Sequence, residues 1–221
     1  MKFKAISLYI VLFFLCSFSS RASFVLFPME AEGQQNHLKA YGITYWALDK
    51  SYKVSWLLNY RGGSFLLPDA PEIRKECQIR GVTFEVLSDA ATNTILEDIS
   101  SPSQNMETVV LEKAPKIAVY TPKGKQPWDD AVTMVLTYAE IPFTEVYDEE
   151  VLSDQLLLYD WLHLHHEDFT GQYGKFFGNY RSTPWYIQQK AEAEALAKKL
   201  GYNKVSEEKL AVAKKIRDFV I

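Results

Sequence analysis

Residues 116–165 decide the fold, and they read KIAVYTPKGKQPWDDAVTMVLTYAEIPFTEVYDEEVLSDQLLLYDWLHLH. Apolar residues recur at spacings of three and one between Trp128 and Ala139, which predicts one apolar stripe on a helix. Asp129 and Asp130 fall in the expected first turn, where negative charge suits the helix dipole. The predicted strands are 116–120, 143–147 and 159–165, and the predicted helices are 128–139 and 149–157. This β-α-β-α-β order with short connections predicts a parallel sheet with helices on both faces.

A helical tail follows this segment. Thr183 and Pro184 are typical of a helix start, and Gly201 is typical of its end. Ser206 is expected to cap a last helix that runs to the end of the chain. We expect this helix to bury Leu210, Ala213, Ile216 and Val220. Its end has neither a stop signal nor a polar tail, and three strands are few for a doubly wound sheet. We therefore expect this chain to be the N-terminal part of a longer protein.

Residues 23–111 predict a separate, small α+β domain. The predicted strands are 43–48, 53–60, 65–67 and 83–87, and the predicted helices are 35–41, 72–80 and 90–99. Arg61-Gly-Gly-Ser64 predicts a turn, with a binding loop as the alternative. Four aromatic residues on the predicted strands favour core packing over a carbohydrate platform; they are Tyr45, Trp46, Trp56 and Tyr60. The expected fold class is thus α/β, with this α+β region followed at 114–221 by an incomplete doubly wound parallel sheet.

The first 22 residues are typical of a signal peptide. Lys2 and Lys4 precede an apolar run from Ala5 to Phe18, and Ser20-Arg-Ala22 is a cleavage site with small residues at both ends. The run is short for a membrane-spanning helix, although a retained signal anchor is the alternative. We expect cleavage after Ala22 and an exported protein, either periplasmic or secreted.

Cleavage would leave 21 basic and 28 acidic residues, so residues 23–221 carry a net charge of about -7 with neutral histidines. This charge lacks the basic footprint of nucleic-acid binding. Only Cys77 would remain as a cysteine, so the processed chain cannot form an internal disulfide. We expect Cys77 to be a packing residue on a helix, because no plausible base lies near it in sequence.

Three of the four histidines lie in a polar cluster at the end of the third predicted strand of 116–165. On an extended strand, His163, His165 and Glu167 share one face, while His166 and Asp168 share the other. Ligands of open α/β sheets bind at the carboxyl ends of the strands, near the topological switch point. The candidate pocket-lining residues are therefore His165, His166, Glu167 and Asp168.

Three interpretations of this cluster stay open. It is a substrate-binding loop, a metal site, or a polar strand end whose histidines pair with the acids or with the backbone. The metal interpretation would use His163, His165 and Glu167. It is the least favoured, because the spacing matches neither HExxH nor separated ligands. His163, which lies deeper in the strand, fits the polar strand end best. No Ser-His-Asp or Cys-His arrangement, no Gly-x-Ser-x-Gly elbow and no P-loop stands out.

Several long runs resemble a family of exported bacterial proteins that commonly carries the label asparagine synthetase B. The resemblance covers nearly the whole processed chain, and it lies in 41–46, 56–65, 116–120, 128–131, 136–142 and 159–176. It implies a class I glutamine-amidotransferase-like, flavodoxin-like second domain. It also implies a glycine-rich strand and a cysteine-containing turn after Ile221. That cysteine would be the nucleophile, and His165 to Asp168 would lie near it.

Asparagine synthesis itself is not expected. Residue 2 is Lys where the N-terminal-nucleophile enzymes need Cys, and processing would expose Ser23. The Ser-Gly-Gly-x-Asp-Ser loop of the ATP site is also absent. We expect an amidohydrolase-type protein that acts on a small-molecule or peptide amide and is inactive without its nucleophile. The alternative is a non-catalytic periplasmic binding or scaffold protein that uses the aromatic first region. We expect no cofactor and no nucleic-acid partner, and membrane contact only through the signal sequence before cleavage.

Overall fold

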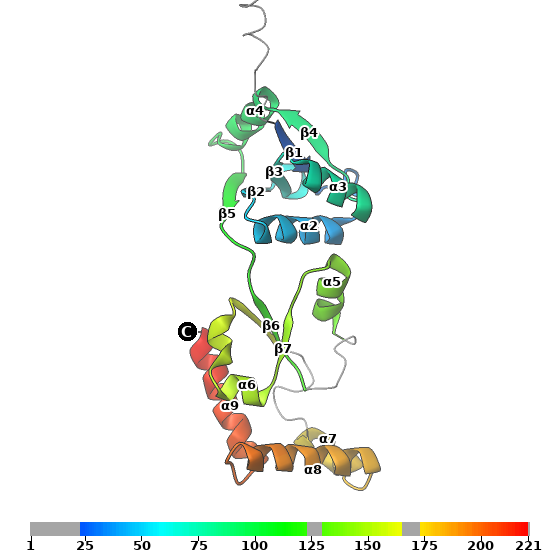
Figure 1. The fold of residues 1–221 in the computed structure, drawn as a ribbon, viewed down its shortest axis with the longest axis vertical. Helices are drawn as coiled ribbons and strands as arrows, with labels where there is room; N and C mark the ends of the chain where they lie inside the picture. Colours follow the sequence, from blue (N-terminus) through cyan, green and yellow to red (C-terminus); the bar gives the residue numbers. More distant parts are fainter. Residues whose placement is uncertain (1–22, 123–129, 165–172, 221) are drawn as a thin grey trace, which may run out of the picture. The chain divides into compact units, whose positions relative to one another are not determined.

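The computed structural model describes residues 23–122, 130–164 and 173–220. The chain divides into two compact units, the first ending at Glu112 and the second starting at Lys113. Each unit has its own sheet (Figure 1). The predicted signal peptide, 1–22, lies outside the described residues. Within these residues no helix has the length and apolar character needed to cross a membrane.

The first unit is built on a five-stranded antiparallel sheet with the strand order β4-β1-β3-β2-β5. Its strands are β1 Ser23–Phe27, β2 Val54–Leu58, β3 Ser64–Pro68, β4 Glu85–Ser88 and β5 Glu107–Leu111. Its α-helices are α2 His37–Asp49, α3 Pro71–Arg80 and α4 Asp89–Ile99. Neighbouring strands are antiparallel, so this unit has the mixed α and β composition that the sequence predicts.

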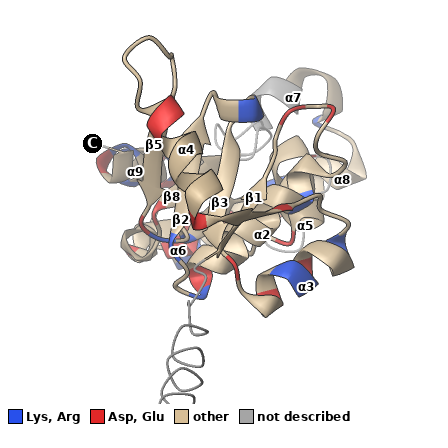
Figure 2. Cartoon of the chain, turned by 90° about the horizontal axis from the view of Figure 1, so that it is seen from above, with Lys and Arg blue, Asp and Glu red and all other residues tan. Residues whose placement is uncertain are grey.

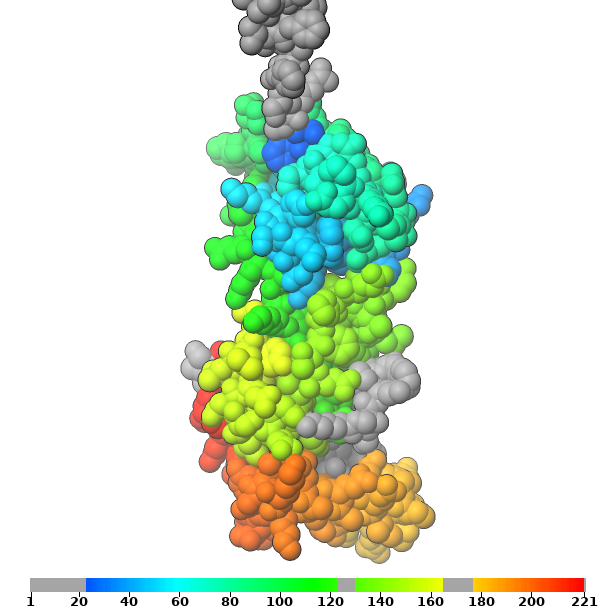
Figure 3. All heavy atoms as spheres, in the orientation of Figure 1, coloured from blue at the N-terminus to red at the C-terminus, as the bar shows by residue number. Residues whose placement is uncertain are grey.

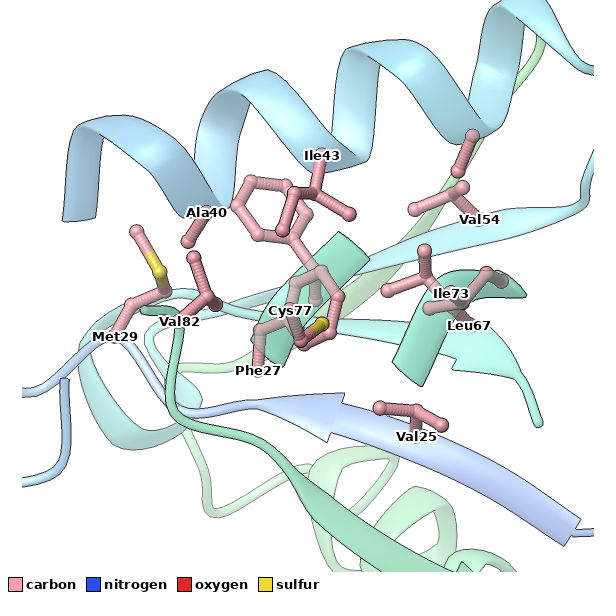
Figure 4. Packing of buried hydrophobic residues seen from close by; sticks show 12 residues of the cluster. Val25, Phe27, Met29, Ala40, Ile43, Val54, Leu67, Ile73, Cys77 and Val82 are labelled. Atoms are coloured by element: carbon pink, nitrogen blue, oxygen red, sulfur yellow. The ribbon is translucent and has the colours of Figure 1, made fainter. Parts of the chain in front are cut away.

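Both faces of this sheet are covered, because alternate residues of β1 enter different cores. Val25 and Phe27 pack with residues of α2 and α3 (Figure 4). Leu26 packs on the opposite face with Ile99 at the end of α4. Helix α3 buries Ile73, whereas Glu72, Arg74 and Lys75 are exposed; Figure 2 colours the charged residues along this helix. A strand buried on both faces has no polar side, which explains the unbroken apolar run of β1.

The prediction of a strand at 43–48 is wrong, because α2 continues through Gly42 to Asp49. Ala40, Ile43 and Ala47 are fully buried and lie on one face of the helix. That burial outweighs the β-propensity of the residues around them. Strands β1 and β5 were not predicted. Helices α3 and α4 confirm the predictions at 72–80 and 90–99, and Ser88 caps α4 by accepting a hydrogen bond from Ala91 N.

The second unit contains a three-stranded parallel sheet with the strand order β7-β6-β8. Its strands are β6 Ile117–Tyr120, β7 Thr144–Val146 and β8 Trp161–Leu164. Its helices are α5 Ala131–Ala139, α6 Asp148–Leu152, the 3-10 turn η3 Gln155–Leu158, α7 Tyr173–Tyr180, α8 Pro184–Lys199 and α9 Val205–Val220. The parallel pairing of all three strands confirms the prediction from 116–165.

The connections of this sheet place its helices on two faces. Helix α5 joins β6 to β7 on one side of β6, and α6 with η3 joins β7 to β8 on the other side. The chain moves across the sheet in one direction from β6 to β7 and in the other direction from β7 to β8. Because crossovers between parallel strands are right-handed, α5 and α6 lie on opposite faces of the sheet. Helix α9 packs on the α6 face, where Val212 and Ile216 join Val151 in one core. The carboxyl ends of the three strands therefore lie along one edge, with the switch point between β6 and β8.

Five details of this unit differ from the predictions. Helix α9 begins at Val205, so Ser206 lies inside the helix and is not its cap. Helix α6 ends at Leu152, and a left-handed residue, Asp154, separates it from η3. Asp130 is the N-cap of α5 rather than part of its first turn. Helix α7 was not predicted. The apolar face predicted for the last helix is confirmed at Ile216, which is buried, but it is wrong at Leu210 and Val220, which are 57% and 76% exposed, and it omits the buried Val212.

Candidate functional site

The structure describes the predicted polar cluster at the end of β8 only as far as Leu164. His165, His166, Glu167 and Asp168 lie outside the described residues, so their role in lining a pocket stays a prediction. His163 is described, on β8. Among the residues that the structure describes, no group of three or more His, Cys, Asp and Glu is arranged to hold a metal ion. Of the three residues in the metal interpretation, only His163 can be placed.

His163 pairs with an acid from the neighbouring helix. Its Nε2 lies 2.9 Å from Oδ2 of Asp130, and the two side chains are 17% and 7% exposed. Asp130 directly precedes α5, which follows β6, whereas His163 lies on β8 beside β6. The parallel pairing of β6 and β8 brings these residues together across 33 positions of sequence. The pair lies near the carboxyl edge of the sheet, close to the switch point.

The other oxygen of Asp130 caps α5. Oδ1 accepts hydrogen bonds from the backbone N–H groups of Val132 at 2.7 Å and Thr133 at 3.1 Å. Burial acts to raise the pKa of Asp130, but the bonds from His163 and these two amides leave that pKa below its ordinary value. The carboxylate is therefore ionised near neutral pH and acts as an acceptor. His163 Nε2 must then carry the hydrogen, which makes Nδ1 the basic nitrogen of the neutral ring.

This arrangement has two chemical consequences. A histidine oriented by a buried carboxylate is the base and orienting pair used in nucleophilic hydrolysis. Asp130 also fills the N-terminus of α5 with a negative charge. In many doubly wound folds, the N-terminus of the helix that follows the central strand binds phosphate. An anion at this point would face the Asp130 carboxylate, so the site suits neutral or cationic ligand groups.

A second polar cluster lies on the opposite face of the same sheet. Tyr120, the last residue of β6, donates its hydroxyl hydrogen to Oδ1 of Asp148 at the start of α6. Lys209 on α9 donates to Oδ2 of Asp148 at 2.7 Å, and to the hydroxyls of Tyr147 at 3.0 Å and Tyr120 at 3.1 Å. Its Nζ also lies 4.4 Å from the centre of the Tyr147 ring.

This second cluster is a structural network. The ammonium group of Lys209 has three hydrogens, and three oxygen atoms accept them. The side chains of Lys209 and Asp148 are 11% and 1% exposed, so this pair of opposite charges is largely enclosed. The network ties α9 to the ends of β6 and β7. Nothing in the sequence pattern pointed to it beyond a tyrosine at the end of a strand and an acid at the start of a helix.

Cys77 confirms the expectation of a packing residue. It is fully buried in the core of the first unit, where burial raises the pKa of its thiol to about 12. A thiol with so high a pKa is protonated at neutral pH and is a poor nucleophile.

The Arg61-Gly-Gly-Ser64 segment is a tight turn, as preferred in the prediction. The Arg61 guanidinium bridges Glu30 at 2.6 Å and Glu85 at 2.8 Å. A Cβ on Gly62 would lie 2.5 Å from backbone atoms of Met29 and Glu30, so this residue must be glycine. The Arg61 side chain therefore forms ion pairs within the first unit.

A cavity of about 650 Å³ opens in the first unit, at the start of β1. Its lining includes Ser23, Asp69 and Arg74. Ser23 Oγ donates to Asp69 at 2.6 Å, and Arg74 forms two hydrogen bonds with the same carboxylate. These three polar groups of the lining therefore bond to one another.

Comparison of the chain with protein-family models, with curated proteins and with solved structures found no match.

Proposed function

We propose that this chain is part of an exported, glutamine-amidotransferase-like amidohydrolase. In this proposal the second unit binds an amide substrate at the carboxyl edge of its parallel sheet. His163 acts there as the base, and Asp130 orients it. The nucleophile is a cysteine outside this chain, as the resemblance implies, so the chain alone binds the amide without hydrolysing it.

The observation that carries the proposal is the His163–Asp130 pair at the carboxyl edge of a β7-β6-β8 sheet. This strand order matches the first three strands of the flavodoxin-like order 2-1-3-4-5, in which ligands bind at the switch point, and the match supports the proposal. A neutral or cationic preference at Asp130 suits an amide or an amino acid better than a phosphorylated ligand.

The proposed reaction has two steps. His163 takes the thiol proton of the external cysteine, the thiolate attacks the amide carbonyl, and the imidazolium gives that proton to the leaving nitrogen, which departs as ammonia. Water then hydrolyses the thioester to the free acid and restores the thiol. The contribution of this chain is to hold the imidazole and the substrate in place.

The alternative of a non-catalytic binding protein rests on the aromatic residues of the first unit. Trp46 and Trp56 pack against the core, and Trp56 Nε1 donates to the carbonyl of Gly63 at 3.0 Å. These contacts support the core-packing interpretation rather than an exposed platform. We therefore prefer the amide-binding proposal.

Ligand binding tests the proposal in the chain as it stands. L-glutamine and L-asparagine are added separately at about 10 mM, ten times the Kd expected for a weak millimolar site. We expect the ring signals of His163 to shift in NMR spectra and the Tm to rise. His163→Gln should abolish the rise in Tm. His37→Gln is the matched control, because His37 lies in the first unit, where its Nε2 lies 3.1 Å from the carbonyl oxygen of Met29.

Two results would contradict the proposal. One is an unchanged His163 spectrum and Tm with both amides. The other is an equal loss of the ligand effect in His163→Gln and His37→Gln, because the effect would then not depend on the carboxyl edge of the second unit.

A further inference from the structure

The first described residue, Ser23, is held at two points by Asp69. Its Oγ donates a hydrogen bond to Oδ2 of Asp69 at 2.6 Å, and its carbonyl oxygen accepts one from the Asp69 backbone N–H at 2.9 Å. Strand β1 also pairs with β3 on one side and with β4 on the other, where Ser23 lies opposite Ser88. The start of β1 is therefore fixed, whereas residues near a chain end are usually loose unless a sheet holds them.

The backbone nitrogen of Ser23 points toward the same partner. In an antiparallel ladder, the N–H and C=O of one residue point to the same neighbouring strand. Because the carbonyl of Ser23 bonds to Asp69 directly after β3, its nitrogen faces this side too. The nitrogen and Oγ of a serine are only three bonds apart, and Oγ already contacts the carboxylate. A positive charge on this nitrogen would therefore lie beside Asp69.

The Asp69 carboxylate is enclosed and ionised. Its side chain is 4% exposed, and Arg74 forms two hydrogen bonds with it. These bonds lower the pKa of Asp69, burial acts against them, and the bond from Ser23 lowers the pKa further. The lining of the adjoining cavity contains two acids, Asp69 and Asp89, and one base, Arg74. One added cation would balance the charge of this lining.

We propose that cleavage between Ala22 and Ser23 creates an ammonium group that binds Asp69 and locks β1 into the sheet of the first unit. Water adds across this peptide bond and leaves a carboxylate on Ala22 and the ammonium group on Ser23. A secretory peptidase is the catalyst. The space-filling view shows the first described residues, in dark blue, at the surface of the first unit (Figure 3).

The cut changes what the Ser23 nitrogen offers to Asp69. Before cleavage it is part of a neutral amide with one hydrogen, whereas the ammonium group has three hydrogens and a full charge. A hydrogen bond with two charged partners is stronger than one with a neutral donor. Processing thus stabilises the first unit as well as freeing it from the leader. This inference rests on the predicted signal peptide, and it does not depend on the amide proposal.

Three chains that differ only at the N-terminus test this inference. The first begins at Ser23 with a free ammonium group, the second is the same chain acetylated at Ser23, and the third begins at Ala22. We expect hydrogen exchange of the β1 amides to be about fivefold slower in the first chain, the upper range for a partly exposed ion pair. The third chain keeps the charge but displaces it by one residue, so it separates position from charge.

Side-chain variants identify the partner of the ammonium group. Asp69→Asn should reduce the effect of acetylation to less than about twofold. Asp89→Asn is the matched control, because Asp89 lines the same cavity at the start of α4. It should keep the fivefold effect, since the hydrogen bond of Ser23 goes to Asp69. If circular dichroism shows that Asp69→Asn does not fold, the comparison of the three N-termini decides.

The intact mass of the protein exported from the full-length gene should match residues 23–221. Any of three results would overturn the inference. One is an N-terminus other than Ser23 in the exported protein. Another is equal exchange rates in the three chains. The last is an acetylation effect of the same size in folded Asp69→Asn and in Asp89→Asn.

Discussion

Replacing Lys209 by Met removes the cation that pairs with Asp148, while it keeps an unbranched side chain of similar length. Asp148 is 1% exposed and would lose a bond of 2.7 Å. The two tyrosine hydroxyls would also lose a donor. The variant therefore leaves a carboxylate enclosed without its counter-charge.

The expected loss follows from this geometry. Removing one partner of a buried ion pair costs about 3–5 kcal/mol in the free energy of unfolding. Asp148 keeps the Tyr120 hydroxyl, and it begins α6, whose dipole offsets about 1 kcal/mol. We expect Lys209→Met to lose about 3 kcal/mol. Asp148→Asn in the same chain removes the enclosed charge and should restore about 1–2 kcal/mol.

Lys215→Met on the same helix is the control. Lys215 pairs with Asp154, but their side chains are 41% and 58% exposed, so the loss should stay below about 1 kcal/mol. Because the chain has two compact units, hydrogen exchange of the amides in β6 and α9 is the measurement of choice, since it reports on the second unit alone. Equal protection in Lys209→Met and Lys215→Met would refute the reasoning.

Three further predictions follow from single sites. Gly62→Ala should destabilise the first unit by well over about 1 kcal/mol, because its Cβ would meet backbone at 2.5 Å. Gly81→Ala, at φ 67 with open space, should cost only about 1 kcal/mol; equal losses in urea titrations would contradict this difference. Cys77, with its pKa raised to about 12, should resist iodoacetamide at neutral pH in the native chain and react in urea; rapid native labelling would refute this assignment. Asp130 has a lowered pKa, so its stabilisation is present above its unfolded value of about 3.9 and is lost as the pH falls through the folded value. Asp130→Asn should remove that part of the acid sensitivity, and an unchanged acid midpoint would count against it.

The second unit was predictable because its local patterns agree with its tertiary structure. Residues 117–120 are all buried, and an apolar run of that length suits a central parallel strand. The apolar stripe from Trp128 to Ala139 predicted α5, because its spacing indicates a helix and Pro142 marks where that helix must have ended. Short connections then left few arrangements other than a parallel sheet.

The first unit was harder to predict because local propensity and tertiary burial disagree in it. Residues 43–48, ITYWAL, are rich in residues that favour strands, and Gly42 is a common helix end. The longer pattern of Ala40, Ile43 and Ala47 nevertheless fits a helix, and the core covers all three. A reading that weighted helical spacing over residue preference would have found α2.

The polar pairs could not be predicted from spacing, because the partners are brought together only by the fold. Asp130 and His163 are 33 positions apart, and Lys209 is 61 positions from Asp148. The last helix shows the consequence. The pattern of apolar residues predicts that α9 buries Leu210 and Val220. The helix instead buries Val212 and Ile216, which lie on the side from which Lys209 contacts Asp148. Rotating the helix to bury Leu210 would expose Val212, which lies on the opposite side of the helix, and would separate Lys209 from Asp148. Apolar burial and the buried ion pair, which costs about 3–5 kcal/mol when one partner is removed, therefore favour the same orientation of α9.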